Sequence, residues 1–179
     1  SLETGKQRTQ GWYLQDNLQL LPSTLISLGA RSESLEIHRD VPFALSMMPV
    51  SQRDDRTLHA WSLGLKQTLG SGWLAHARTG TSYRIANVDE NRCYAAPCAL
   101  LQPQTSKDHE LGLAWSSKIA SASVVFFRND LENELYFNRL AGGLGANVNM
   151  PPTRREGIEL AAAWKPAASI SMSGRYVWT

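Results

Sequence analysis

The sequence predicts an all-β protein, in which about eight antiparallel, up-and-down strands form part of a larger transmembrane β-barrel. Three observations predict this class. Apolar and polar residues alternate with a period of two in about eight segments, short and long connections alternate along the chain, and tryptophans recur at two levels. No segment carries a convincing helical period, and no apolar run is long enough for a transmembrane helix.

The expected strands are joined by two kinds of connection. The alternation covers residues 8–20, 24–36, 57–69, 72–84, 107–116, 119–130, 154–164 and 168–179. Short connections fall near 21–23, 70–72, 116–118 and 165–168, and long ones near 37–56, 85–106 and 131–153. In an up-and-down membrane barrel the short turns are periplasmic and the long loops extracellular. A Greek-key sandwich has no reason to separate them.

Aromatic residues mark two levels along these strands. Beside short turns lie Trp73, Trp115 and Trp164; about eight to eleven residues from a short turn lie Trp12, Trp61, Tyr83 and Trp178. Nine residues at about 3.3 Å each, tilted by about 40°, rise roughly 23 Å. This rise matches an apolar band about 25 Å tall with an aromatic girdle at each interface.

One face of each strand is expected to contact lipid, and the other to line a wet lumen. In the last two segments the lipid face carries Ile158, Leu160, Trp164, Ile170, Met172, Tyr176 and Trp178; in the fourth it carries Trp73, Ala75, Ala77 and Tyr83. The lumen-facing charged residues are Arg31, Lys66, Arg78, Glu110, Glu159 and Arg175. We expect a curved open sheet, or part of a barrel, and not a closed eight-stranded one.

Two places break the alternation. Asp16 shares its parity with apolar residues, and either a β-bulge or a position near the periplasmic rim would explain it. The segment 119–130 is ambiguous, because Val124, Val125, Phe126 and Phe127 fill both faces.

Composition and motifs exclude several classes of function. The net charge of +2, from 18 basic and 16 acidic residues, gives no reason to propose nucleic acid as a partner. No catalytic constellation stands out, the four histidines are scattered, and we expect neither enzymatic activity, nor a cofactor, nor a metal site. Cys93 and Cys98 suggest a local disulfide formed in an oxidising compartment, and two free thiols are the alternative.

Four stretches resemble, in order, motifs of TonB-dependent outer-membrane receptors. They are GWYLQDNLQLLPSTLISLGARSE (11–33), SYRIANVDE (82–90), LQPQTSKDHELGLAW (101–115), and ELYFN followed by ANVNMPPTRREGIELAAAW (134–164). Ala86 stands where the family often has proline, and Leu18 where tryptophan is common. The resemblance implies a barrel of about 22 strands. We expect residues 1–179 to be a fragment of its later part, without the plug domain and the terminal strands.

The resemblance also implies a function and partners. It implies a receptor in the outer membrane of a Gram-negative bacterium that imports a scarce nutrient, most often an iron–siderophore complex, energised by the TonB complex acting on the absent plug. Outer-membrane lipid and lipopolysaccharide would surround the barrel. The lumen-facing charges would form ion pairs across neighbouring strands or contact the plug.

Candidate cargo-binding residues lie in the long connections, because aromatic rings and guanidinium groups suit a chelate rich in oxygen. They are His38, Arg39, Arg84, Asn87, Tyr94, Tyr136, Arg154 and Arg155. For Arg154 and Arg155 the alternative is a charge pair at the rim that interacts with lipopolysaccharide or Glu156. For Arg84, Asn87 and Glu90 the alternative is a structural role at the loop exit.

Three other functions stay open on sequence grounds. A passive porin or an adhesin barrel would share the architecture without a plug. An outer-membrane enzyme would need a catalytic set at the outer rim. A soluble β-sandwich would bury Trp164 and Trp178.

Overall fold

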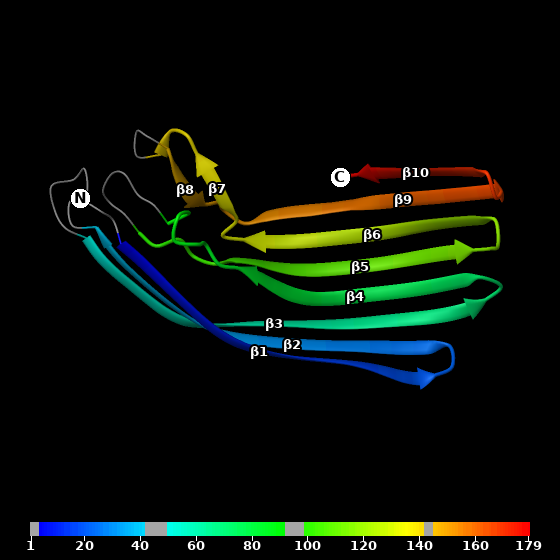
Figure 1. The fold of residues 1–179 in the computed structure, drawn as a ribbon, viewed down its shortest axis with the longest axis horizontal. Helices are drawn as coiled ribbons and strands as arrows, with labels where there is room; N and C mark the ends of the chain where they lie inside the picture. Colours follow the sequence, from blue (N-terminus) through cyan, green and yellow to red (C-terminus); the bar gives the residue numbers. More distant parts are fainter. Residues whose placement is uncertain (1–3, 42–49, 92–98, 142–144) are drawn as a thin grey trace.

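The computed structural model describes residues 4–41, 50–91, 99–141 and 145–179, which form ten β-strands (Figure 1). The strands are β1 (Thr4–Leu21), β2 (Thr24–Val41), β3 (Val50–Gly70), β4 (Trp73–Arg84), β5 (Gln104–Ser116), β6 (Ala120–Glu132), β7 (Leu135–Asn138), β8 (Ala146–Asn149), β9 (Thr153–Ala167) and β10 (Ile170–Trp178). No helix among the described residues is long and apolar enough to cross a membrane.

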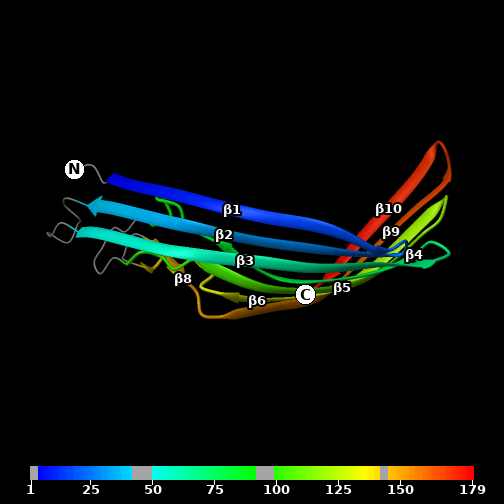
Figure 2. The ribbon, with the colours of Figure 1, turned by 90° about the horizontal axis from the view of Figure 1, so that it is seen from below.

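Eight of the strands form one antiparallel sheet in the order β1-β2-β3-β4-β5-β6-β9-β10, and β7 pairs with β8 as a separate hairpin. The short turns gather at one end of the sheet and the long connections at the other (Figure 1). The sheet is curved (Figure 2). In the described part of the chain β1 and β10 do not pair, so the sheet is open. The predicted up-and-down topology and the open sheet are both confirmed.

The register places apolar residues of neighbouring strands beside one another on one face. Leu28 lies opposite Leu63, and Phe126 lies opposite both Leu111 and Ile158. On the last two strands Leu160 and Met172 are 45% and 58% exposed. No second layer of the described chain covers this face, which is the face predicted to contact lipid.

The two faces of β6 are now distinguished. Val124 lies opposite Leu113 and Leu160 on the apolar face, whereas Phe127 lies on the other face, opposite Gly157. A Cβ atom on Gly157 would come within 2.9 Å of the Phe127 ring. The missing side chain at Gly157 therefore makes room for an aromatic ring on the inner face.

Asp16 remains on the apolar face. It pairs with Leu28, and the register of β1 shifts only between Gln19 and Leu21, nearer the turn. A bulge at that place leaves Asp16 on the same face as Leu14, so it does not explain the mismatch. The Asp16 carboxylate accepts a 2.8 Å hydrogen bond from the backbone N–H of Asn17.

The strands differ from the predicted segments at the long-connection end. The first three strands extend to Thr4, Val41 and Val50, beyond the predicted limits, because the hydrogen-bonded ladder continues where the apolar pattern has stopped. The predicted loop 131–153 contains the hairpin β7–β8, which we did not expect.

The pairing of β3 with β4 ends at Trp61 and Thr81, although β3 continues to Val50. Gly80 allows a close approach here, since a Cβ atom on it would lie 2.5 Å from the carbonyl oxygen of Trp61. Beyond this point the end of β4 lies against the inner face of β2, where Tyr83 reaches Glu33. The prediction that Tyr83 faces lipid is therefore wrong, because the strand that carries it leaves its neighbour.

A small core lies at this end, on the inner face of the sheet. Leu35 and Ile37 of β2 are 3% and 4% exposed, and Ala86, just after β4, is 2% exposed. A Cβ atom on Gly5 would lie 2.4 Å from Val88, so the segment after β4 packs against the inner face of β1 as well. This segment forms a second layer over the ends of β1 and β2.

Candidate ligand-binding end and lumen wall

The segment that follows β4 is held in a turn by its own side chains. Arg84 and Glu90 form an ion pair. The Glu90 carboxylate accepts a 2.9 Å hydrogen bond from the backbone N–H of Asn87, and the Asn87 side-chain oxygen accepts a 2.8 Å bond from the backbone N–H of Glu90. The spacing of three residues lets each side chain close on the backbone of the other. These contacts explain the SYRIANVDE stretch as a structural turn, and cargo contact by Arg84 or Asn87 stays a prediction.

The hairpin β7–β8 is attached to the connection between β4 and β5. Asn149 bonds to the backbone of Gln102 twice, at 2.8 and 2.9 Å, and to the carbonyl oxygen of Asn133 at 2.9 Å. Asn147 donates a 2.9 Å hydrogen bond to the carbonyl oxygen of Glu90. Two long connections therefore meet through asparagine side chains. This joint was not predicted, because the asparagines of ANVNM give no sign of their distant partners.

A polar cluster around the buried Glu33 joins β2 to the end of β4. Glu33, only 7% exposed, forms an ion pair with Arg31 and accepts a 3.0 Å hydrogen bond from the Tyr83 hydroxyl. The Arg31 guanidinium lies 5.5 Å from the centre of the Tyr83 ring, within the range of a cation–π contact. The inner position of Arg31 agrees with its parity, and the structure adds Glu33 and Tyr83 as its partners.

The other loop candidates lie in different surroundings. His38 contacts Asp40 at 2.8 Å. The Ser51 hydroxyl and, after it, His38 lower the pKa of Asp40, so this carboxylate is ionised and attracts the His38 imidazole. Arg39 is buried at 1% exposure, so a bound molecule reaches it only if the surrounding residues move, whereas Tyr136 is 55% exposed on the hairpin. Tyr94, Cys93 and Cys98 lie outside the described residues.

Arg154 and Arg155 are engaged with acidic residues. Arg154 donates a 2.6 Å hydrogen bond to Asp130, and Arg155 pairs with Glu134. The hydrogen-bonded partners are thus on β6 and before the hairpin, and Glu156 also attracts Arg154 through its charge. Contact of either arginine with cargo stays a prediction.

The inner face of the sheet carries all six predicted lumen charges. Glu110 accepts from His76 at 2.9 Å across β4 and β5, and Arg175 pairs with Glu159 across β9 and β10. Arg31 pairs with Glu33 along its own strand. Arg78 lies opposite Glu110 in register, but among the described residues neither Arg78 nor Lys66 forms an ion pair. Among the described residues one cross-strand ion pair of the predicted set, Arg175–Glu159, is therefore present, and Glu110 contacts His76 instead of a second member.

Within the described residues no group of three or more His, Cys, Asp or Glu side chains could hold a metal ion. The long-connection end instead carries arginine side chains, the exposed Tyr136 and asparagine amide groups. These groups suit the oxygen-rich outer surface of a chelate.

The fold and its two faces define a class: a wall segment of an outer-membrane β-barrel, with one face for lipid and one for the lumen. The sequence matches the family described as "TonB dependent receptor-like, beta-barrel" over residues 1–179. The chain therefore belongs to the TonB-dependent receptors, as part of their outer-membrane barrel.

Individual proteins show the same kinship. The chain is 25% identical over 150 residues to the ferric enterobactin receptor PirA of Pseudomonas aeruginosa. The matched region covers 73% of this chain and 18% of that relative. The structure of the siderophore receptor PiuA of Acinetobacter baumannii is also similar, with 16% identity and a TM-score of 0.77. The match covers 98% of this chain and 26% of the PiuA chain.

The structure of the copper transporter OprC is similar with 13% identity and the same TM-score of 0.77. The match covers 97% of this chain and 29% of the OprC chain. Two structures whose names refer to different cargo are thus equally similar in fold. The chain spans less than a third of the length of each of these three proteins, and the likeness to the two structures is one of fold.

Proposed function

We propose that this chain forms part of the wall and outer mouth of an active-transport receptor that imports a scarce nutrient, and that the nutrient is an iron–siderophore complex. The observation that carries the proposal is the family match over residues 1–179. The named relative, a ferric enterobactin receptor, supports the choice of cargo.

In this proposal the described residues have two roles. The long-connection end, with Tyr136, Arg84 and Asn87, contributes to the surface on which cargo first binds. The inner face, with its charges on β4, β5, β9 and β10, lines the route that the cargo takes. The energised movement belongs to a plug domain in another part of the receptor, on which the TonB complex acts. No catalytic step and no cofactor are assigned to this chain.

The experiment that tests this function uses the full-length gene in iron-starved cells. A deletion strain is compared with the same strain carrying the gene, and uptake is measured for catecholate, hydroxamate and citrate complexes of iron, for haem and for cobalamin. We expect the deletion to lower uptake of one iron–siderophore class at least tenfold.

The same uptake measured in a strain without TonB separates the receptor from a passive pore. An active receptor loses uptake without TonB, whereas a porin continues to conduct. Uptake of every compound unchanged by the deletion contradicts import, and uptake that persists without TonB contradicts the energised mechanism.

A further inference from the structure

The outer end of β3 has an unpaired edge. From Val50 to Ala60 this strand keeps its ladder with β2, whereas its pairing with β4 ends at Trp61 and Thr81. Within the described chain no other strand takes the place of β4 along these residues, and no backbone hydrogen bond from a turn or loop reaches them. This stretch of β3 is therefore paired on one side only.

The backbone groups along this edge have a regular direction and spacing. In an antiparallel strand each residue exchanges both backbone bonds with one neighbour, and successive residues alternate between the two neighbours. Trp61 is directed to β4, because its N–H donates a 3.3 Å bond to the Thr81 hydroxyl and its carbonyl oxygen lies 2.5 Å from the Cβ position of Gly80. The edge residues that share this direction are Ser51, Arg53, Asp55, Thr57 and His59. Their N–H and C=O groups recur about every 6.8 Å.

The end of β4 is held away from this edge by contacts on the inner side. Tyr83 donates a 3.0 Å hydrogen bond to Glu33 of β2, on the other side of β3. Arg56, on the inner face of β3, donates a 2.8 Å bond to Gln102, which precedes β5. Side chains therefore bridge the inner side of the gap, and the backbone edge is left without a ladder.

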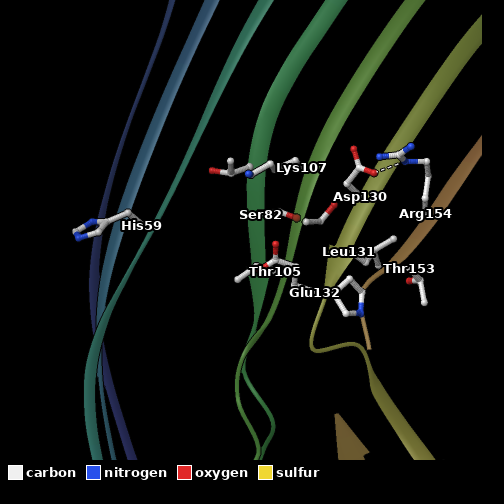
Figure 3. A pocket seen from close by; sticks show the side chains of 12 residues that line it. His59, Ser82, Thr105, Lys107, Asp130, Leu131, Glu132, Thr153 and Arg154 are labelled. Atoms are coloured by element: carbon white, nitrogen blue, oxygen red, sulfur yellow. Dashed lines mark hydrogen bonds and ion pairs between the residues drawn. The ribbon is translucent and has the colours of Figure 1, made fainter. Parts of the chain in front are cut away.

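A hollow of about 590 Å³ lies beside this edge, on the outward side of the sheet (Figure 3). His59 of β3 forms one side of the hollow, apart from Ser82, Thr105 and Lys107 of β4 and β5 (Figure 3). Ligand pockets in proteins have volumes of about 300–1,000 Å³. Space for a bound segment thus lies next to the unpaired backbone groups.

The side chains around the hollow carry more positive than negative charge. Among the described residues Lys107 makes no ion pair, and Asp130 is shared by Arg154 at 2.6 Å and Arg128 at 3.0 Å. Glu132 adds a second carboxylate to the lining. Three basic side chains therefore face two acidic ones, which favours an acidic segment over a basic one.

The direction of approach indicates where such a segment comes from. The rest of a barrel continues from β1 and β10, the two outermost strands of the sheet. On the inner side the segment after β4 packs against β1, and Tyr83 and Arg56 close the gap. The hollow lies on the outward side, so a strand that reaches this edge comes from outside the receptor.

From these observations we propose that the outer end of β3 is a docking edge for a partner protein at the cell surface, which adds an acidic extended segment to the sheet as a further strand. Another polypeptide strand matches the unpaired groups, since its own donors and acceptors recur at the same spacing. Its side chains lie in the hollow beside His59 and Lys107. The docking does not depend on the identity of the cargo.

The test uses the full-length receptor in mild detergent and three labelled probe peptides of about ten residues. The first alternates glutamate with threonine, the second alternates lysine with threonine, and the third is the acidic peptide with its backbone nitrogens methylated. Binding is measured by fluorescence anisotropy. We expect the unmethylated acidic peptide to bind at least fivefold more tightly than each of the other two.

Hydrogen exchange locates the bound peptide. The acidic peptide should slow exchange of the Asp55 and Thr57 amides at least tenfold, and should leave the Leu58 amide, which is directed to β2, unchanged within twofold. Amides of Asp55 and Thr57 that are already protected in the receptor alone would show that another part of the receptor occupies the edge, which overturns the proposal.

The decisive variant is Thr57→Pro, which removes one N–H from the unpaired edge and keeps the ladder with β2. Proline is tolerated on an edge strand where its nitrogen faces away from the ladder. Binding of the acidic peptide should fall at least fivefold in Thr57→Pro and less than twofold in the matched control Thr57→Val. Lys107→Gln should lower it at least threefold through the charge alone.

Correct folding of each variant is checked by heat-modifiable mobility on gels. The proposal is overturned if the acidic peptide does not bind, if the basic or the methylated peptide binds equally well, or if Thr57→Pro and Thr57→Val bind alike. These results leave the uptake experiment unaffected.

Discussion

The side chain of Asn149 and the backbone of Gln102 bond to each other in both directions. The Gln102 N–H donates to the Asn149 Oδ1 at 2.8 Å, and the Asn149 Nδ2 donates to the Gln102 carbonyl oxygen at 2.9 Å. The Asn149 side-chain amide thus donates and accepts like the backbone of a residue in a paired strand. Because Asn149 ends β8 and Gln102 precedes β5, this contact joins two connections that are far apart in sequence.

The substitution Asn149→Ala should separate these connections without unfolding the sheet. It removes three hydrogen bonds, each worth about 1 kcal/mol net. Hydrogen exchange of the Gln102 amide in the full-length receptor should become at least tenfold faster.

Asn138→Ala is the matched control, because within the described residues the Asn138 side chain accepts a single 3.0 Å bond, from Leu140 next to the same hairpin. It should leave exchange at Gln102 unchanged. Equal exchange rates in wild type and Asn149→Ala would show that this contact does not hold the connections together.

The substitution Glu33→Ala should destabilise the outer end of β2 and β4. It leaves the partly buried Tyr83 hydroxyl without its acceptor and the exposed Arg31 guanidinium without its ion pair, which together cost about 1–2 kcal/mol. The measurement is the free energy of unfolding in urea, for the receptor folded into lipid vesicles. The control Glu36→Ala removes an exposed pair with Arg53 at 3.1 Å, and should cost less than about 1 kcal/mol. A larger loss for Glu36→Ala than for Glu33→Ala would contradict this.

Adjacent lysine substitutions on β6 test which face meets lipid. Val124→Lys places a charge on the apolar face between Leu113 and Leu160, and should cost about 2–4 kcal/mol of unfolding free energy in vesicles. Ser123→Lys places the same charge on the inner face, between Ala114 and Ala161, and should cost less than about 1 kcal/mol. Equal costs at the two positions would mean that the faces are wrongly assigned.

The substitution Gly112→Ala should displace His76. A Cβ atom there would lie 2.1 Å from the His76 ring, and that ring contacts Glu110 at 2.9 Å. We expect a loss of about 0.5–1.5 kcal/mol, because the displaced ring gives up its contact with Glu110; the measurement is urea unfolding in vesicles. Gly64→Ala is the control, because its nearest neighbour, Ser27 Cβ, would be at an ordinary 3.5 Å. A loss for Gly64→Ala as large as that for Gly112→Ala would show that the ring is not the cause.

The faces of the main sheet could be predicted because lipid on one side and water on the other impose a strict period of two. Leu28, Leu63 and Leu111 were assignable from parity alone. The lumen pair Arg175–Glu159 also followed from parity, since both residues occupy inner positions on neighbouring strands.

The long-connection end could not be predicted in the same way. Beyond the apolar row both faces are polar, so the alternation fades although the ladder continues, and the strand ends were placed too early. Tyr83 was misassigned because parity describes a strand relative to its neighbours, and β4 leaves β3 at Thr81. The joint at Asn149 depends on contacts between distant residues, which no local pattern reveals.

Where β3 and β4 separate, side-chain contacts replace the hydrogen-bonded ladder of the wall. Between Val50 and Ala60, β3 keeps its ladder with β2, but no strand of the described chain pairs with it on the other side. Side chains cross that side instead, such as Arg56, which donates a 2.8 Å bond to Gln102. The wall therefore lacks a continuous ladder between β3 and β4 at this end, and we expect a force across the strands to separate them there first. There the strands β1, β2 and β3 are joined to the rest of the wall by side chains, such as the Tyr83–Glu33 bond, and not by a ladder.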